Sequence, residues 1–144
     1  MKDKIVIVTG ASGGLETHVT QAFLDAGATV VGISRNIRQS DFSNPAFAAH
    51  PADLSAAEAA REVADFTVAR FGRLDVLAHL MGGFSGGKPV AETDDATFQA
   101  MFDVNVNTSV HIVRATLPHL RRAGHGRIIA IGSRLDRTRS DRSA

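Results

Sequence analysis

A glycine-rich stretch near the amino terminus has the residue types and the spacing that hold a phosphate group. It spans residues 9–16 (TGASGGLE), between a β-branched run at residues 4–8 and a helical pattern that begins at Gly14. Glycines let backbone N–H groups approach a diphosphate closely, and the amino terminus of a helix adds partial positive charge. The stretch therefore predicts a nucleotide site, and a merely tight turn between a strand and a helix is the alternative interpretation.

The elements around this stretch alternate between strand and helix. Buried apolar runs predict strands at residues 4–8, 28–34, 74–81 and 128–131. Amphipathic patterns predict helices at residues 14–26, 55–71 and 93–122. Ser55 and Glu58 have the spacing of a capping box, and the irregular stretch 36–52 has room for one very short strand. This order predicts an α/β fold, with a doubly wound parallel sheet that binds ligands at the carboxyl ends of its strands.

Composition and charge exclude several classes of protein. The 144 residues are 44% hydrophobic and 22% charged, as in one ordinary soluble domain, and the net charge of +1 favours neither nucleic acid nor a membrane as a partner. The absence of cysteine excludes a disulfide scaffold and thiolate chemistry. The sequence has neither a membrane span nor a signal peptide, so we expect a cytoplasmic protein. Residues 1–133 are the expected domain, and the Arg- and Asp-rich residues 134–144 the expected disordered basic tail.

Further motifs, in their order and spacing, resemble those of the short-chain dehydrogenase/reductase family. The positions that match the family's motifs are Thr9, Gly10, Gly14, Asp53, Gly82, Asn105 and Ser133. The resemblance covers residues 4–133 and implies a Rossmann fold with strand order 3-2-1-4-5, incomplete at its carboxyl terminus. It implies an NAD(P)-dependent oxidoreductase that transfers a hydride between the nicotinamide and a small-molecule carbonyl or alcohol. Ser133 and Asn105 are the implied catalytic residues.

The implied cofactor site combines the glycine-rich stretch with the ends of the next strands. Its residues are Gly10, Ser12, Gly13, Gly14, Leu15, Ser34, Arg35, Arg38, Asp53, Leu54 and Gly82. Members of the family that use NAD carry an acid after the second strand, whereas this chain has Ser34, followed by Arg35 and then Arg38. A hydroxyl beside guanidinium groups suits a 2′-phosphate, so the expected cofactor is NADP rather than NAD. The alternative is that both arginines are ordinary solvated surface charges.

Glu16 departs from the family pattern, because it stands where the fingerprint has its third glycine. Seven residues separate Glu16 from the core-facing Phe23, which is close to two helical turns. We therefore expect its carboxylate to point towards the phosphate site and to repel the cofactor. The alternative is a solvent-facing acid that stabilises the first turn of the helix.

The second departure concerns proton transfer. The family uses a Tyr-x-x-x-Lys pair, but the chain contains no tyrosine, and no lysine follows Ser133. We expect the chain as it stands to be catalytically incompetent, and a shifted reading frame or premature stop after Ser133 is our hypothesis for its origin. The alternative function is a non-catalytic dinucleotide-binding or oligomer-forming remnant that self-associates through the helix at residues 94–122.

Other signals favour structural roles. Residues 82–88 have the glycine and lysine spacing of a P-loop, but Pro89 replaces the hydroxyl that magnesium needs. The six histidines lack metal-ligand spacing, so no metal site is expected. We interpret His79 as a satisfied core histidine, with donation to a backbone carbonyl as the alternative. Asn105 lies on an apolar stripe, so we expect a buried amide that bonds neighbouring backbone and marks a kink.

Overall fold

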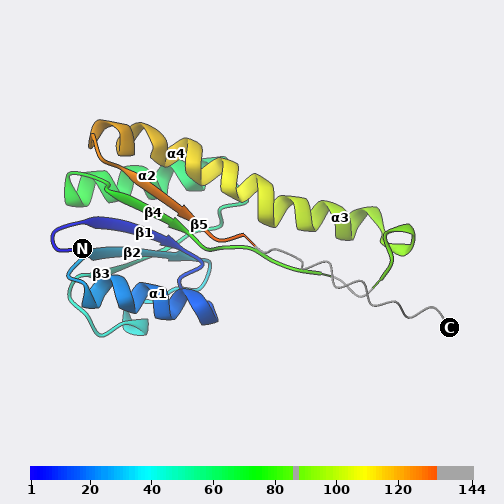
Figure 1. Cartoon of the computed structure of the whole chain (residues 1–144), viewed down its shortest axis with the longest axis horizontal. Helices are drawn as coiled ribbons and strands as arrows, with labels where there is room; N and C mark the ends of the chain where they lie inside the picture. Colours follow the sequence, from blue (N-terminus) through cyan, green and yellow to red (C-terminus); the bar gives the residue numbers. More distant parts are fainter. Residues whose placement is uncertain (86–87, 133–144) are drawn as a thin grey trace.

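A five-stranded parallel sheet forms the centre of the computed structural model, which describes residues 1–85 and 88–132 (Figure 1). In the described residues the strand order is β3-β2-β1-β4-β5. The strands are β1 (Ile5–Thr9), β2 (Thr29–Ser34), β3 (Phe47–Pro51), β4 (Val76–His79) and β5 (Arg127–Ala130). These strands confirm the predicted doubly wound sheet and its strand order. The irregular stretch at residues 36–52 does contain a strand, β3. The expected tail at residues 134–144 lies outside the described residues.

Helices cover both faces of the sheet. Helix α1 (Gly14–Asp25) packs on one face, and α2 (Ala57–Phe71) and α4 (Thr108–Arg122) pack on the other (Figure 1). Side chains of the central strands alternate between the two layers: Val6 and Val30 join the core below α1, whereas Ile7 and Val31 join the core of α2 and α4. All four are fully buried, as expected for parallel strands with helices on both faces.

The predicted long helix is interrupted. Helix α3 (Asp95–Phe102) continues through a π-helical turn, η3 (Asp103–Asn107), directly into α4. The Asp94 side chain caps the start of α3 by accepting a hydrogen bond from the Thr97 N–H at 2.7 Å. Two short 3₁₀ turns, η1 (Gln39–Asp41) and η2 (Val90–Glu92), complete the helical elements of the described residues. No helix in this part of the chain combines the length and apolar character that a membrane span requires.

The predicted capping box at the start of α2 is wrong. The helix begins at Ala57 with Ala56 at its N-cap, where no side chain caps it. The Asp53 carboxylate accepts the Ser55 N–H at 3.0 Å, so Ser55 belongs to a turn before the cap. Glu58 instead pairs with Arg61 at 2.6 Å on the helix surface.

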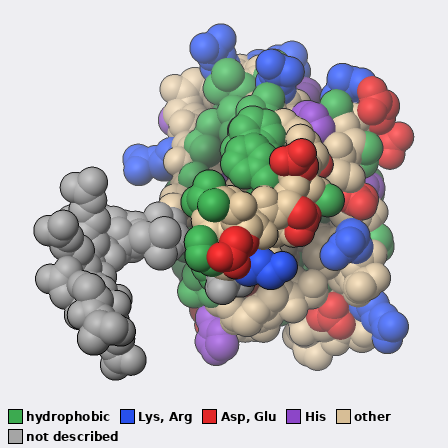
Figure 2. All heavy atoms as spheres, turned by 90° about the vertical axis from the view of Figure 1, so that its right-hand side faces the viewer, with side chains coloured by type: hydrophobic (Ala, Val, Ile, Leu, Met, Phe, Trp, Pro, Cys, Tyr) green, Lys and Arg blue, Asp and Glu red, His purple; other side chains and the backbone are tan. Residues whose placement is uncertain are grey.

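One edge of the molecule exposes apolar side chains. All of β5 is exposed, including Ile128 at 42% and Ile129 at 44%. Along α3, η3 and α4 a second exposed apolar set consists of Phe98, Phe102, Val106 and Val110. Figure 2, which faces the end of the molecule where α3 lies, shows hydrophobic side chains gathered over this helical segment.

Candidate nucleotide-binding site

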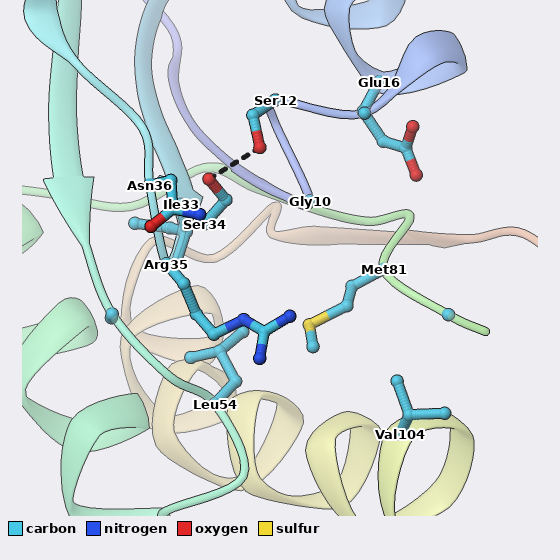
Figure 3. Close-up of a pocket in the computed structure, with 13 residues that line it drawn as sticks. Gly10, Ser12, Glu16, Ile33, Ser34, Arg35, Asn36, Leu54, Met81 and Val104 are labelled. Carbon is cyan, nitrogen blue, oxygen red and sulfur yellow. Dashed lines mark hydrogen bonds between the residues drawn. The ribbon is translucent and has the colours of Figure 1, made fainter. Parts of the chain in front are cut away.

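A pocket of about 350 Å³ opens at the carboxyl ends of β1, β2 and β4 (Figure 3). Most of the predicted cofactor-binding residues line it: Gly10, Ser12, Gly13, Ser34, Arg35, Leu54 and Gly82. Because parallel strands end at the same edge of the sheet, residues from four separate segments meet here. The pocket lies where an open α/β sheet binds its ligands.

Four of the predicted residues do not line this pocket. Gly14 begins α1, and the neighbouring Leu15 is 55% exposed. Arg38 is exposed at the start of η1, where its N–H donates to the Asp41 carboxylate at 2.9 Å. Asp53 is also exposed, and hydrogen bonds from Ser55, reinforced by the charge of Arg35, lower its pKa.

The turn after β1 lies close to the Met81 backbone and to the Glu16 side chain. Gly10 has φ +77°, a conformation that side chains strongly disfavour, and the Gly13 N–H donates to its carbonyl at 2.7 Å. A Cβ on Gly10 would lie 3.4 Å from the Met81 Cα and 3.3 Å from the Glu16 Cγ. The backbone angle therefore requires glycine here, and the space beside it is filled by the Glu16 side chain and the Met81 backbone.

The Glu16 side chain folds back over this glycine turn. Its Oε2 would overlap a Cβ placed on Gly13, and its Oε1 lies 3.3 Å from the position that a Cβ on Gly10 would occupy. The side chain lines the pocket and is half-buried (Figure 3). Glu16 therefore has the orientation that the helical spacing predicted, with its negative charge against the backbone that would receive a phosphate.

The other end of the pocket carries hydroxyls and a guanidinium group. Ser12 Oγ donates to Ser34 Oγ at 2.8 Å, which joins the glycine turn to the end of β2 (Figure 3). The Arg35 side chain extends across the pocket towards Met81. Asn36 also lines this end; it was not predicted, although it continues the run of polar residues directly after the buried strand.

Other missed lining residues are apolar: Ile33, Ala52, Met81 and Val104. These side chains add apolar surface to the pocket, which suits a flat aromatic ring. The places of Met81 and Val104 depend on how the segment after β4 and η3 pack, which the spacing of residues along the chain does not reveal.

His79 is buried at the end of β4, and both of its ring nitrogens have partners. Nδ1 lies 2.9 Å from Thr9 Oγ1, and Nε2 lies 2.8 Å from Ser109 Oγ. Burial lowers the pKa of the imidazole, so the ring is neutral at pH 7. These contacts agree with the interpretation of a satisfied core histidine, because the partners are hydroxyls rather than a backbone carbonyl.

Asn105 is exposed rather than buried, which corrects the sequence-based expectation. It lies in the π-helical turn, where its Oδ1 accepts the Gly83 N–H at 3.1 Å. Its Nδ2 donates to the carbonyls of Gly83 and Met101, each at 2.9 Å. The expected backbone contacts are therefore present, and they hold the segment after β4. Ser133, and Gly87 of the P-loop-like spacing, lie outside the described residues.

Several dehydrogenases are similar to this chain. An L-fucose dehydrogenase from Oryctolagus cuniculus is 31% identical over 135 residues, which cover 90% of this chain and 46% of that protein. An 11-beta-hydroxysteroid dehydrogenase A from Sesamum indicum is 33% identical, with 90% of this chain and 39% of that protein covered. The chain spans about half the length, or less, of these curated relatives.

Solved structures share the fold. A short-chain dehydrogenase from Streptomyces avermitilis aligns with a TM-score of 0.81 at 31% identity, over 90% of this chain and 49% of that one. An NADH-dependent reductase complexed with NAD aligns with a TM-score of 0.81 at 22% identity, over 92% of this chain and 60% of that one. The similarity to the NADH-dependent reductase shows a shared fold alone.

The sequence profile of one protein family matches almost the whole chain. It is described as short chain dehydrogenase and matches residues 4–142. The strand order, the glycine turn at the carboxyl edge and the similar dehydrogenases agree with this match. The chain belongs to the short chain dehydrogenase family of oxidoreductases.

Proposed function

We propose that the chain binds NADP in the pocket at the carboxyl ends of β1, β2 and β4. The observation that carries this proposal is the pairing of the Ser12 and Ser34 hydroxyls at 2.8 Å beside the Arg35 guanidinium. Hydroxyl and guanidinium donors match the oxygens of a 2′-phosphate. Among the described residues, no carboxylate lines this end of the pocket to chelate the ribose hydroxyls of NAD.

The cofactor would lie across the pocket from the end of β2 to the segment after β4. Its diphosphate would meet the N–H groups of the glycine turn, and its nicotinamide would extend towards Gly82. A bound dinucleotide would supply the hydride chemistry: as NADPH it would donate a hydride to a carbonyl carbon, and as NADP⁺ it would accept one from an alcohol carbon. The residues of this chain bind and orient it.

Arg35→Ala is expected to weaken NADPH binding about 10- to 100-fold, because a charge-assisted hydrogen bond contributes about 1.5–3 kcal/mol. NADH, which has no 2′-phosphate, should be affected far less. The measurement is a fluorescence titration with both nucleotides, carried out in a Glu16→Gly background so that the carboxylate on the glycine turn does not mask binding.

Arg61→Ala provides the matched control, since Arg61 is an exposed arginine of α2 that does not line the pocket. It should leave both affinities unchanged. If the protein prefers NADH before any change at Arg35, the assignment of NADP is wrong and NAD, the cofactor of the structurally similar NADH-dependent reductase, takes its place.

The second candidate function is a non-catalytic dinucleotide-binding protein that self-associates. It is favoured by the absence of tyrosine, the family's proton donor, from the 144 residues and by the exposed apolar set Phe98, Phe102, Val106 and Val110 on the long helical segment. We expect no NADPH-dependent reduction of a panel of aldehydes and ketones by the 144-residue chain. Any turnover above the rate without protein would exclude this candidate and show that another group donates the proton.

A further inference from the structure

Three side chains form a continuous hydrogen-bond chain behind the nucleotide pocket. Thr9 Oγ1, at the end of β1, lies 2.9 Å from His79 Nδ1. His79 Nε2 lies 2.8 Å from Ser109 Oγ, and Ser109 Oγ donates at 2.6 Å to the main-chain carbonyl of Asn105 in the π-helical turn. The chain of contacts joins the edge of the sheet to the helical segment that covers it.

The two ends of this chain fix where the proton of His79 lies. Thr9 Oγ1 accepts the N–H groups of Leu80 at 3.1 Å and Met81 at 3.3 Å, which occupies both of its lone pairs. Its own proton must therefore go to His79 Nδ1. At the other end, Ser109 uses its single proton on the Asn105 carbonyl, so it must accept a proton from Nε2. Both ends require the neutral ring with hydrogen on Nε2.

We propose that His79 is a positioning residue for nucleotide binding, whose neutral, Nε2-protonated ring holds the wall of the pocket and whose protonation weakens binding. The inference rests on the proposed function, because the wall in question consists of Gly10 and Met81. Thr9 immediately precedes Gly10, and its hydroxyl anchors the Met81 N–H. A second ring proton would face an oxygen that already accepts two hydrogen bonds, and it would leave the Thr9 proton without an acceptor.

The surroundings of His79 make burial the dominant influence on its charge. In the described residues, the hydrogen-bond partners of its ring are Thr9 of β1 and Ser109 of α4, and its neighbour across to β5 is Ala130; none of these residues is charged. Burial alone accounts for the lowering of its pKa. The ring is therefore neutral at pH 7, and the change in binding should occur below about pH 6.5, the ordinary range of histidine.

The tautomer can be measured on the 144-residue chain without nucleotide. Long-range ¹⁵N–¹H NMR spectra at pH 7 should show hydrogen on Nε2 of His79 and a bare Nδ1. Amide hydrogen exchange of Leu80 and Met81 should be slow at pH 7, and it should lose protection as His79 is protonated. Hydrogen on Nδ1 of the neutral ring would overturn the proposed arrangement.

The role in binding is tested by measuring the Kd for NADPH at pH 7 and at pH 5 in the Glu16→Gly background. We expect affinity to fall about tenfold at the lower pH, and the additional substitution His79→Gln, which cannot titrate, should remove most of this fall. The comparison between variants also cancels the ionisation of the 2′-phosphate, which occurs in the same range. An equal fall in the presence of His79→Gln would overturn the proposal.

His50→Gln is the matched control. His50 lies on β3, and burial, partly opposed by Glu62, also lowers its pKa, but its ring packs on Phe66 away from the hydrogen-bond chain. This change should leave the pH dependence of binding intact. If Glu16→Gly binds no nucleotide at any pH, the proposed function and the role of His79 in binding both fail, whereas the tautomer still decides whether the hydrogen-bond chain exists.

Discussion

Glu16→Gly is expected to tighten nicotinamide dinucleotide binding by about one to two orders of magnitude. A carboxylate about 4 Å from a phosphate charge meets a repulsion of about 4 kcal/mol at an effective dielectric constant near 20. Glu16 is half-buried, so solvent screening reduces this figure. The opposing gain from an acid near the amino terminus of a helix is only about 0.3–1 kcal/mol. The measurement is the Kd for NADPH and NADH by fluorescence titration at constant ionic strength.

Two further variants separate the effect of the Glu16 charge from the effect of its size and from the effect of removing any negative charge from the protein. Glu16→Gln keeps the size of the side chain and should recover most of the gain if charge is the cause. Glu58→Gln removes a first-turn acid from α2, away from the pocket, and should leave both affinities unchanged. Equal or weaker binding by Glu16→Gly and Glu16→Gln would show that the carboxylate does not face the phosphates.

The central strands of the fold could be predicted from local sequence, because each is a short apolar run buried on both faces. Strand β3 gave a much weaker signal, since His50 and Pro51 break the apolar pattern of Phe47–Pro51. Its extended form depends on pairing with β2, where Phe47 lies opposite Val30. The false capping box has a similar cause: the Asp53 turn, set by the end of β3, decides where α2 begins.

The candidate site was predictable wherever a residue lies at or just after the carboxyl end of a strand. Gly10, Ser34 and Gly82 met at one edge because parallel strands end together. Val104 was missed because it comes from the π-helical turn, whose approach to the sheet depends on the Asn105 contacts with Gly83. Asn105 itself was expected to be buried from the apolar stripe, but its neighbours Phe102 and Val106 are 45% and 40% exposed.

Asp75 is a further residue whose importance only the structure reveals. It lies just before β4, at the end of the sheet opposite the pocket, with its side chain 1% exposed. Its Oδ2 accepts the Ile5 N–H at 2.9 Å, and its Oδ1 pairs with the Arg73 guanidinium and with His125 Nε2, the latter at 3.0 Å. Lys4 Nζ lies 3.5 Å from the same oxygen. The carboxylate thus joins segments that are far apart in the sequence.

Asp75→Ala is expected to lower the free energy of unfolding by about 3 kcal/mol, because it leaves the Ile5 N–H without an acceptor and the Lys4 and Arg73 charges without their partner. For a domain of this size the corresponding loss in Tm is about 10 °C. Thermal and urea unfolding followed by circular dichroism measure both quantities. Asp75→Asn keeps an acceptor for Ile5 and should cost about 1 kcal/mol, since mainly the charge is lost.

The difference in free energy of unfolding between the unmodified chain and Asp75→Asn should depend on pH, and this dependence tests the contribution of the Asp75 charge. Burial raises the pKa of Asp75, but the hydrogen bonds from Ile5, Arg73 and His125 and the charge of Arg73 outweigh it, so the pKa is lowered overall. The folded state therefore binds the proton less readily than the unfolded chain, and the stabilising contribution is complete above about pH 4 and is lost as pH falls through the lowered pKa. The stabilities of the unmodified chain and of Asp75→Asn should accordingly converge in acid. A gap between them that stays constant down to pH 2 would mean that the Asp75 charge contributes nothing to the fold.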